Sequence, residues 1–347
     1  MRILALLTHA ADGEGGIARF NHDLLRALGA LPDVERVDAL SRQGRGGAGP
    51  SGRLAYALRS LRTAMTGGRY DAVFCGHLHL APLAAALARL KGAPLWLQLH
   101  GIEAWQRPSA VRAIAVRQAA LVTAVSRYTR SRFLEWSGVP ADRVKLLPNT
   151  VDERFSPGPR PAALVRKLGL EDRRVLLTVA RINRGDRRKG HDKVLAAVKR
   201  LAARRPELAY VVVGDGDDRP RLEALAQEAG IADRVHFVGQ VSDSELVNYY
   251  RLADVFVMPS TKEGFGIVFL EAAASGLPVI GGDRDGSADA LADGSIGTMV
   301  NPDDAAALDR AIEQALDSPR PDAGRVAPFR VEAFRRQVAA LVRELAR

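Results

Sequence analysis

The chain has 347 residues, of which 47% are hydrophobic and 26% charged, and its formal net charge is +10. These values indicate a globular protein long enough for two domains, and they exclude a globally disordered chain. The single cysteine, Cys75, excludes an internal disulfide and fits a reducing compartment. Because no run approaches the roughly 18 apolar residues of a membrane span, we expect a cytoplasmic protein with at most a peripheral contact at the inner face of the cell membrane.

The positive charge narrows the choice of ligands. Arginine is far commoner than lysine, so part of the charge fits a compositional bias of the coding sequence, and the rest favours anionic ligands. We expect no nucleic-acid partner, because only 5% of the residues are aromatic and no nucleic-acid-binding module is recognisable. A nucleotide diphosphate or an anionic lipid surface fits the charge better.

The first strand is expected at residues 1–8, an apolar run that resembles a secretion signal only superficially because it leads into a glycine-rich loop without a cleavage pattern. A helical pattern with apolar Phe20 and Leu28 follows. The turn between them contains Gly15 and Gly16 but lacks the G-x-G-x-x-G spacing, so it does not support a nicotinamide cofactor. The two glycines still permit a backbone nest against a charged or sugar-like ligand.

The alternation continues through the first half, with strands expected at 34–40, 71–75, 94–99, 121–125 and 144–147. The glycine- and arginine-rich segment at 43–52 is expected to be mobile. The helix that follows, at 54–65, has Arg53, Arg59 and Arg62 on or near one side. A solvated helix face is favoured over a membrane-surface helix there, because the apolar side of the helix also has to cover the sheet.

His100 directly follows the strand expected at 94–99. Ligands of open α/β sheets bind outside the carboxyl ends of the strands, so this histidine is placed where a functional one would be. A lone histidine can equally be a structural hydrogen-bonding residue, and the residues alone leave both roles open.

The second half repeats the pattern after a proline-rich joint at 155–159, with strands expected at 174–180, 208–213, 235–238, 254–260, 277–280 and 297–300. The last two helices are expected at 305–316 and 331–345. Two such sets predict an α/β protein with two doubly wound parallel-sheet, Rossmann-like domains that face each other across a cleft.

We expect an N-terminal domain at 1–155, on which a C-terminal helix at about 331–347 packs back, and a C-terminal domain at 160–328. The two domains are expected to close on their ligand through the joint and to exclude water from the reacting centre.

The stretch from Glu263 to Glu271 concentrates the local signals for a ligand site. Gly264 and Gly266, on either side of Phe265, let a ligand approach the backbone closely. A helix that begins at Gly266 leaves unpaired N–H groups and a positive dipole end toward an anion. The residues alone do not decide between such an anion site and an ordinary strand–helix junction with two solvated glutamates.

A basic cluster follows the strand expected at 174–180 and consists of Arg181, Arg184, Arg187, Arg188 and Lys189. Because strand ends in one sheet face the same edge, this cluster and the helix start at 266–268 are expected to converge as a diphosphate clamp. Only one or two of the arginines need to point inward.

These motifs together resemble a known family. They are Gly15-Gly16, His100-Gly101, Ser126, the segment 148–152, Arg181 with Lys189-Gly190, the segment 213–216, the segment 239–241, and Glu263-x7-Glu271. They occur in the order found in the retaining glycosyltransferases of family 4, which have the GT-B fold, and the resemblance covers nearly the whole chain. It implies a metal-independent hexosyltransferase without a cofactor, whose substrates are a nucleotide-sugar donor and a saccharide or lipid-linked acceptor held mainly by the N-terminal domain, as in cell-envelope or exopolysaccharide assembly.

The resemblance also implies a role for each catalytic residue. Arg181 and Lys189 would hold the donor diphosphate and stabilise the negative charge of the leaving group. Glu263 would sit against the donor sugar, and His100 would reach that sugar near its C6 hydroxyl. The departing phosphate would take the acceptor proton in a front-face attack, so no protein nucleophile is expected.

The donor-binding residues follow in the same way. Glu271 would accept hydrogen bonds from the ribose, Val241 would contact the base, and Gly16 would let its loop approach the phosphates. The phosphates would also meet the backbone of the helix start, at Gly264, Phe265, Gly266, Ile267 and Val268.

Two departures from the family pattern bear on this site. Asp215-Gly216-Asp217 and Asp283-Arg284-Asp285 resemble the Asp-x-Asp metal motif of the other large glycosyltransferase fold. The cationic clamp already supplies what magnesium would supply, so we expect no metal. The loop at 178–189 is longer and richer in arginine than the commonest pattern, which leaves the choice between Arg181 and Arg184 open.

The donor is expected to be GDP-mannose. A UDP-sugar such as UDP-glucose is close behind, because Val241-Ser242-Asp243 does not decide which base is bound. A nucleotide-sugar epimerase and a non-catalytic nucleotide-sugar-binding protein remain as alternatives.

Overall fold

The computed structural model describes residues 1–9, 15–42 and 50–346. The chain divides into two compact units. Unit 1 comprises Met1–Thr150 and Val331–Arg347, and unit 2 comprises Val151–Arg330. Each unit is built around its own parallel sheet and is described by itself below.

The sheet of unit 1 has six strands in the order β2-β1-β3-β4-β5-β6, and all neighbouring pairs are parallel. The strands are β1 (Arg2–Leu7), β2 (Arg36–Ser41), β3 (Ala72–Cys75), β4 (Leu95–Leu99), β5 (Ala119–Ala124) and β6 (Val144–Leu146). The strands β3 and β4 are buried along their whole length, which is why they read as continuous apolar runs.

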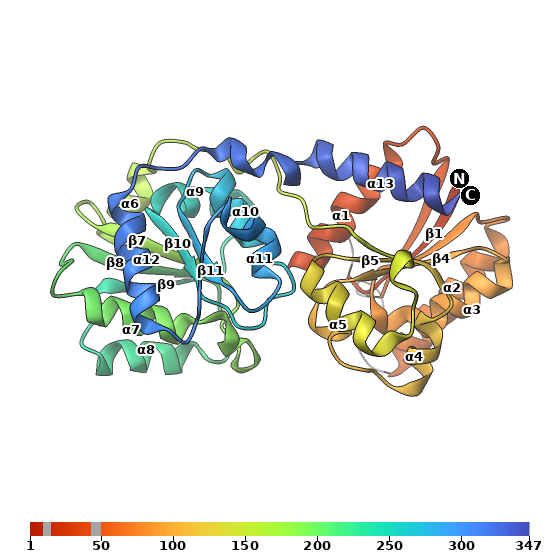
Figure 1. Ribbon diagram of the computed structural model, residues 1–347, viewed down its shortest axis with the longest axis horizontal. Coiled ribbons are helices and arrows are strands. Elements are labelled where there is room, and N and C mark those ends of the chain that lie inside the picture. Colours follow the sequence, from red (N-terminus) through yellow and green to blue (C-terminus); the bar gives the residue numbers. More distant parts are fainter. Residues whose placement is uncertain (10–14, 43–49, 347) are drawn as a thin grey trace. The chain divides into compact units, whose positions relative to one another are not determined.

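Helices cover both faces of this sheet (Figure 1). One face bears α2 (Pro50–Thr66), α3 (Ala81–Lys91), α4 (Ala110–Val116) and α5 (Arg127–Ser137), whose inner side chains share one core with the strands. The other face bears α1 (Gly16–Gly29) and α13 (Val331–Leu345). The rings of Phe20 and Phe334 join these two helices edge to face, with their centroids 5.9 Å apart.

The sheet of unit 2 also has six parallel strands, in the order β12-β11-β10-β7-β8-β9. The strands are β7 (Arg174–Val179), β8 (Leu208–Val213), β9 (Val235–Gly239), β10 (Val255–Met258), β11 (Val279–Gly282) and β12 (Thr298–Val300). The helices are α6 (Ala162–Leu168), α7 (His191–Leu201), α8 (Arg219–Glu228), α9 (Asp243–Leu252), α10 (Ile267–Ala274), α11 (Ser287–Ala290) and α12 (Ala305–Asp317). Of these, α7, α8 and α12 pack on one face around a common core.

The predicted α/β class with two doubly wound parallel sheets is confirmed. The predicted strands lie within about two residues of the observed ones, whereas α3, α6 and α11 were not predicted. Of the segment 43–52, which we expected to be mobile, residues 43–49 lie outside the described residues, and α2 already begins at Pro50.

Helix α2 covers the sheet with Tyr56, Ser60 and Ala64, of which Tyr56 and Ala64 belong to the core of unit 1. The larger apolar side chains Leu54 and Leu58 are exposed. Small and hydrogen-bonded side chains let the helix lie close to the strands. None of the helices in the described part of the chain combines the length and the apolar character that a membrane span requires.

Candidate functional site

The loops after β7 and β10 meet at the carboxyl edge of the unit 2 sheet. The Lys189 ammonium donates a hydrogen bond to the Glu263 carboxylate, and only 17% and 15% of these two side chains are exposed. The backbone N–H of Thr261 donates to the carbonyl of Arg188 at 2.9 Å. Two segments that are 74 residues apart in sequence therefore place a cation and a carboxylate in direct contact.

The arginines of the basic cluster have different partners. Arg188 donates to the buried carboxylate of Asp186 at 3.1 Å, and Arg181 lies 3.4 Å from the other oxygen of the same carboxylate. The Arg181 side chain is nevertheless 73% exposed. A long, exposed side chain held by one contact can swing onto an anion at little cost.

Arg187 is held more firmly than Arg181. It donates to Asp218 at 2.8 Å, and Arg221 donates to the same carboxylate at 2.6 Å. The hydrogen bonds from Arg221 and Arg187 keep the pKa of Asp218 well below its usual range. Arg187 is thus committed to the structure of unit 2, and Arg181 and Lys189 are the better candidates for binding a ligand.

Helix α10 begins at this same edge. Gly266 precedes it with a φ of 88°, a conformation that favours glycine. Ile267 and Val268 occupy the first turn, where backbone N–H groups lack intrahelical acceptors, and the N–H of Phe269 donates to the carbonyl of Gly266 at 3.0 Å. The helix start thus directs N–H groups and its positive dipole end toward the region of the ion pair.

The remaining predicted residues of this stretch are more buried. Glu271 is 1% exposed and accepts a hydrogen bond from the Tyr250 hydroxyl at 2.7 Å. Phe265 is 2% exposed and packs against the Phe329 ring, so only its backbone is available to a ligand. Val241 is half-buried and directly precedes Ser242, the N-cap residue of α9.

A buried carboxylate that sequence reasoning did not assign to the site holds the Glu263 backbone. One oxygen of Asp285 accepts from the N–H of Glu263 at 2.5 Å and from the Ser260 hydroxyl at 3.0 Å, and the other accepts from the N–H of Ser287 at 2.9 Å. Burial raises the pKa of Asp285, and the negative charge of Glu263 adds to that effect. The only sequence signal was the Asp-x-Asp pattern at 283–285, which we compared with a metal motif.

Gly286, the residue after Asp285, also holds the loop that contains Glu263. The N–H of Gly286 donates to the carbonyl of Glu263 at 2.8 Å, and a Cβ at position 286 would lie 2.0 Å from the carbonyl oxygen of Gly264. Glycine is therefore required for the close approach of the two loops. The other Asp-x-Asp motif lies in the loop after β8, where Asp215 accepts from the N–H of Gly216 and Asp217 from the N–H of Arg184.

Within the described ranges, no group of three or more His, Cys, Asp or Glu side chains is arranged to hold a metal ion. The positive charges at this edge come from the basic cluster, in which Arg184 is also exposed, and from the start of α10.

Gly16 and His100 belong to unit 1. Gly16 is exposed at the start of α1. The His100 ring contacts the carbonyl of Gly76 at 2.9 Å and packs edge to face on Phe20, and its backbone N–H donates to Glu103 at 2.5 Å. Burial lowers the pKa of His100, so the ring is uncharged at neutral pH.

Two more histidines, not found from the sequence, lie beside His100 after β3. The rings of His77 and His79 are 4.5 Å apart, and the Nδ1 of His77 accepts from the N–H of His79 at 3.1 Å. This acceptor role requires an unprotonated Nδ1. Burial lowers the pKa of His77 to about 2, which agrees with the geometry.

The buried His77 predicts a loss of stability in acid. Because its folded-state pKa is about 2 and that of an unfolded histidine is about 6.5, the unfolded chain binds more protons between these values. Stability should therefore fall as the pH drops below about 6.5, by at most about 1.4 kcal/mol per pH unit from this residue. Denaturant unfolding should show that the free energy of unfolding falls less between pH 7 and pH 5 for His77→Gln than for wild type. The control His22→Gln, at an exposed position of α1, should show the same decrease as wild type. Equal losses in all three proteins would contradict this account.

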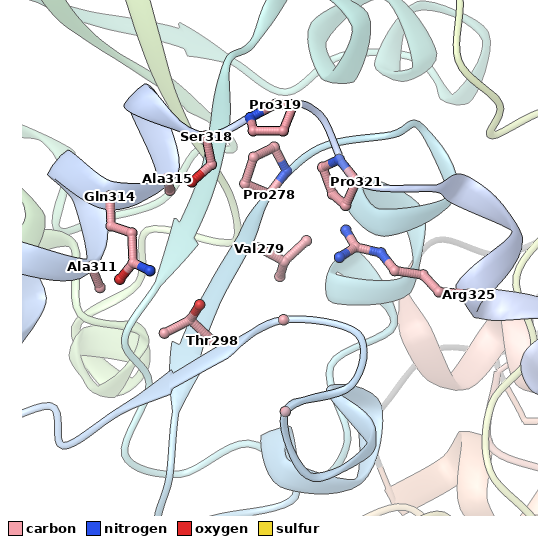
Figure 2. Close-up of a pocket in the computed structure, with 12 residues that line it drawn as sticks. Pro278, Val279, Thr298, Ala311, Gln314, Ala315, Ser318, Pro319, Pro321 and Arg325 are labelled. Atoms are coloured by element: carbon pink, nitrogen blue, oxygen red, sulfur yellow. The ribbon is translucent and has the colours of Figure 1, made fainter.

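The pocket drawn in Figure 2 lies elsewhere in unit 2. It has a volume of about 210 Å³ and is lined by Val279 at the start of β11, Thr298 at the start of β12, and Arg325. Strand starts mark the edge of the sheet opposite to the one with Lys189 and Glu263. No residue of the predicted site lines this pocket.

Two family models match the chain. Residues 14–155 match the model described as Glycosyltransferase Family 4, and residues 163–327 match the one described as Glycosyl transferases group 1. The two matches together cover most of both units.

Curated relatives and solved structures agree with these matches. The chain is 37% identical over 255 residues to a GDP-mannose-dependent alpha-(1-6)-phosphatidylinositol monomannoside mannosyltransferase of Mycolicibacterium smegmatis, covering 69% of this chain and 66% of the relative, just under two thirds of its length. It is 30% identical over 291 residues to the alpha-D-kanosaminyltransferase of Streptomyces kanamyceticus, covering 79% of this chain and 75% of the relative. The structure of Anabaena HepE in complex with UDP and glucose matches with a TM-score of 0.79 at 20% identity, covering 99% of this chain and 100% of that one, and this likeness shows the fold.

Proposed function

Because this chain belongs to the glycosyltransferases of family 4 and has their GT-B fold, we propose that it transfers a hexose from a nucleotide diphosphate sugar to an acceptor. The observation that carries the proposal is the contact of Lys189 with Glu263 beside the start of α10. This arrangement combines a cation and helix N–H groups, which suit a diphosphate, with a carboxylate, which suits sugar hydroxyls.

The proposed mechanism assigns the leaving group to the cations. The Lys189 ammonium and the Arg181 guanidinium bind the diphosphate, with the N–H groups of Ile267 and Val268, and stabilise the charge that develops as the glycosidic bond breaks. Positive charge from these groups makes a metal ion unnecessary. Lys189 is paired with Glu263 before the donor binds, so the position of its ammonium group is already set. The donor phosphate then binds this ammonium group together with Glu263.

The sugar and the nucleoside are assigned to the other residues. Glu263 contacts the donor sugar, Glu271 accepts from the ribose hydroxyls, and Val241 contacts the base, while His100 and Gly16 contribute from unit 1 to the donor sugar and the phosphates. The acceptor hydroxyl bonds to the anomeric carbon from the same face from which the diphosphate leaves, and the departing phosphate takes the acceptor proton. This front-face attack retains the anomeric configuration without a protein nucleophile.

We propose GDP-mannose as the donor, which the name of the mannosyltransferase relative supports. Purified protein should release GDP from GDP-mannose faster than UDP from UDP-glucose, and the released mannose should first appear as the α-anomer when followed by NMR. Faster release of UDP would indicate that the donor is a UDP-sugar. Release of an epimerised nucleotide sugar would indicate an epimerase. Binding without turnover in the presence of acceptors would indicate a non-catalytic nucleotide-sugar-binding protein.

The proposed acceptor is a saccharide attached to a lipid, held mainly by unit 1. The name of the mannosyltransferase relative includes phosphatidylinositol. The net charge of +10 favours an anionic membrane surface, at the inner face of the cell membrane, as the location of the reaction. Transfer to a lipid-linked acceptor should exceed hydrolysis of the donor, and equal rates with and without lipid-linked acceptors would contradict this choice.

A further inference from the structure

The Glu271 carboxylate lies against an aromatic side chain of another helix. Helices α9 and α10 are on the same face of the unit 2 sheet, opposite to α7 and α8 (Figure 1). From α9, the Tyr250 hydroxyl donates a hydrogen bond to the Oε2 of Glu271 at 2.7 Å, and both side chains are buried. An ionised carboxylate only accepts hydrogen bonds, so the tyrosine is the donor, and such a bond is charge-assisted.

Aromatic packing fixes the direction of the Tyr250 side chain. Its ring packs edge to face on the buried Phe155, with the ring centroids 5.6 Å apart. A second ring, that of Phe256 in β10, lies 6.0 Å away, and Phe256 packs edge to face on Phe269 of α10 at 5.8 Å. In a closely packed core a side chain keeps one rotamer. The Tyr250 hydroxyl is therefore a fixed donor beside α10.

These ring contacts do not explain the hydroxyl of Tyr250, because phenylalanine would make the same contacts. The hydroxyl acts on Glu271. The last side-chain torsion of a glutamate is broad, so the plane of its carboxylate is set by hydrogen bonds rather than by the rotamer. A donor whose own position is locked by packing fixes that plane.

We propose that Tyr250 is a positioning residue for the nucleotide, and that its hydroxyl holds one oxygen of Glu271 so that the carboxylate faces the ribose hydroxyls. This inference rests on the proposed function, in which Glu271 accepts from the ribose. A carboxylate has about four acceptor sites on its two oxygens, so the bond from Tyr250 does not exhaust them. The ribose then meets an acceptor that is already oriented, and less freedom is lost on binding.

The same arrangement makes Tyr250 a determinant of sugar specificity within the nucleotide. A buried acceptor that is oriented toward a ligand hydroxyl discriminates against an analogue without that hydroxyl, because the acceptor then stays unpaired. Loosening the carboxylate should therefore reduce the preference for ribose over a deoxygenated sugar. A tyrosine that served only the packing of unit 2 would not affect this preference.

Isothermal titration of the full chain with GDP and with its 2′,3′-dideoxy form tests the proposal. Wild type should bind GDP about tenfold or more tightly than dideoxy-GDP. Tyr250→Phe should bind GDP about fivefold more weakly than wild type, whereas its affinity for dideoxy-GDP should stay within about twofold. In transfer from GDP-mannose, this variant should raise KM and leave kcat within about twofold, because the ribose contact is the same in the ground state and the transition state.

Two comparisons isolate the contact with Glu271. Tyr210→Phe is the matched control, since Tyr210 is also fully buried and its hydroxyl donates to the Thr178 hydroxyl at 2.8 Å, between β8 and β7. This control should keep the wild-type ratio of the two affinities. In the Glu271→Ala background, Tyr250→Phe should change GDP affinity by less than about twofold, because the hydroxyl acts through the carboxylate.

The outcomes separate this inference from the proposed function. Equal losses of affinity for GDP and dideoxy-GDP in Tyr250→Phe, or a loss for GDP that persists in the Glu271→Ala background, would overturn the positioning role and leave the transferase in place. A wild type that prefers neither GDP nor UDP to its dideoxy form would overturn the ribose-binding role of Glu271 and the inference with it.

Discussion

Replacing Lys189 with alanine is expected to lower kcat/KM for hexose transfer by about a hundredfold to a thousandfold. The variant removes the least exposed cation of the candidate site, which is the group placed to hold the diphosphate as its charge develops. Steady-state kinetics with GDP-mannose measure the effect. The matched control is Lys193→Ala, because Lys193 is also paired with a carboxylate, at 2.7 Å from Asp303, but lies on α7. Equal losses in both variants would remove the special role of Lys189.

The same substitution leaves Glu263 largely buried without its partner, so a loss of stability has to be separated from a loss of chemistry. The double variant Lys189→Ala with Glu263→Gln should regain most of the melting temperature of wild type, because the uncompensated charge is gone. It should not regain activity. Recovery of activity together with stability would mean that Lys189 acts only through the fold.

Replacing Asp285 with alanine is expected to lower the free energy of unfolding by about 3 kcal/mol and to reduce transfer strongly. Three donors lose an acceptor in a buried place, and one of them is the backbone N–H of Glu263 itself. The turn that carries the Glu263 carboxylate would then be held less firmly. Denaturant unfolding and kcat measure the two effects. Asp283→Ala, two residues earlier and in contact with Arg284 only at 3.8 Å, should change stability by less than about 0.5 kcal/mol.

The pH dependence of the free energy of unfolding gives a second test of the role of Asp285. Burial raises its pKa in the folded state, so the folded chain binds more protons than the unfolded chain above the ordinary value of about 3.9. The contribution of protonated Asp285 is complete below that value and is lost as the pH rises through the folded-state pKa. The stability of wild type relative to Asp285→Asn should therefore be greatest near pH 4 and decrease toward neutral pH. A difference that stays constant with pH would show that Asp285 does not titrate in this range.

Much of the fold follows from local patterns in the sequence. The buried strands are short apolar runs bounded by glycine or proline, and the start of α10 lies where glycines precede a run of helix formers. The Lys189–Glu263 contact could be predicted only in outline, because both residues follow strands whose carboxyl ends lie at the same edge of one sheet. The sequence did not show which of the five basic residues would make the contact, because Arg188 pairs with Asp186, two residues earlier, and Arg187 pairs with Asp218 in a distant loop.

Helix α2 shows why some features could not be predicted. A helical stripe of leucines is expected to cover a sheet, since burial of apolar side chains is the dominant favourable term in folding. In α2 the hydrogen bonds of Tyr56 and the small side chains at 60 and 64 decide the rotation instead. Asp285 was missed for a related reason, because its role is to bind backbone groups of a distant loop, and such a role has no signature in its own neighbourhood.

The central claim is that the Lys189–Glu263 edge of unit 2 binds a nucleotide diphosphate sugar. Isothermal titration of GDP-mannose into wild type and into Glu271→Ala tests it most directly. We predict a dissociation constant in the micromolar range for wild type and binding weakened by about tenfold or more for the variant, because the ribose loses a charged acceptor. Absence of micromolar binding by wild type to both GDP- and UDP-sugars, together with no effect of the Glu271 substitution, would contradict the assignment.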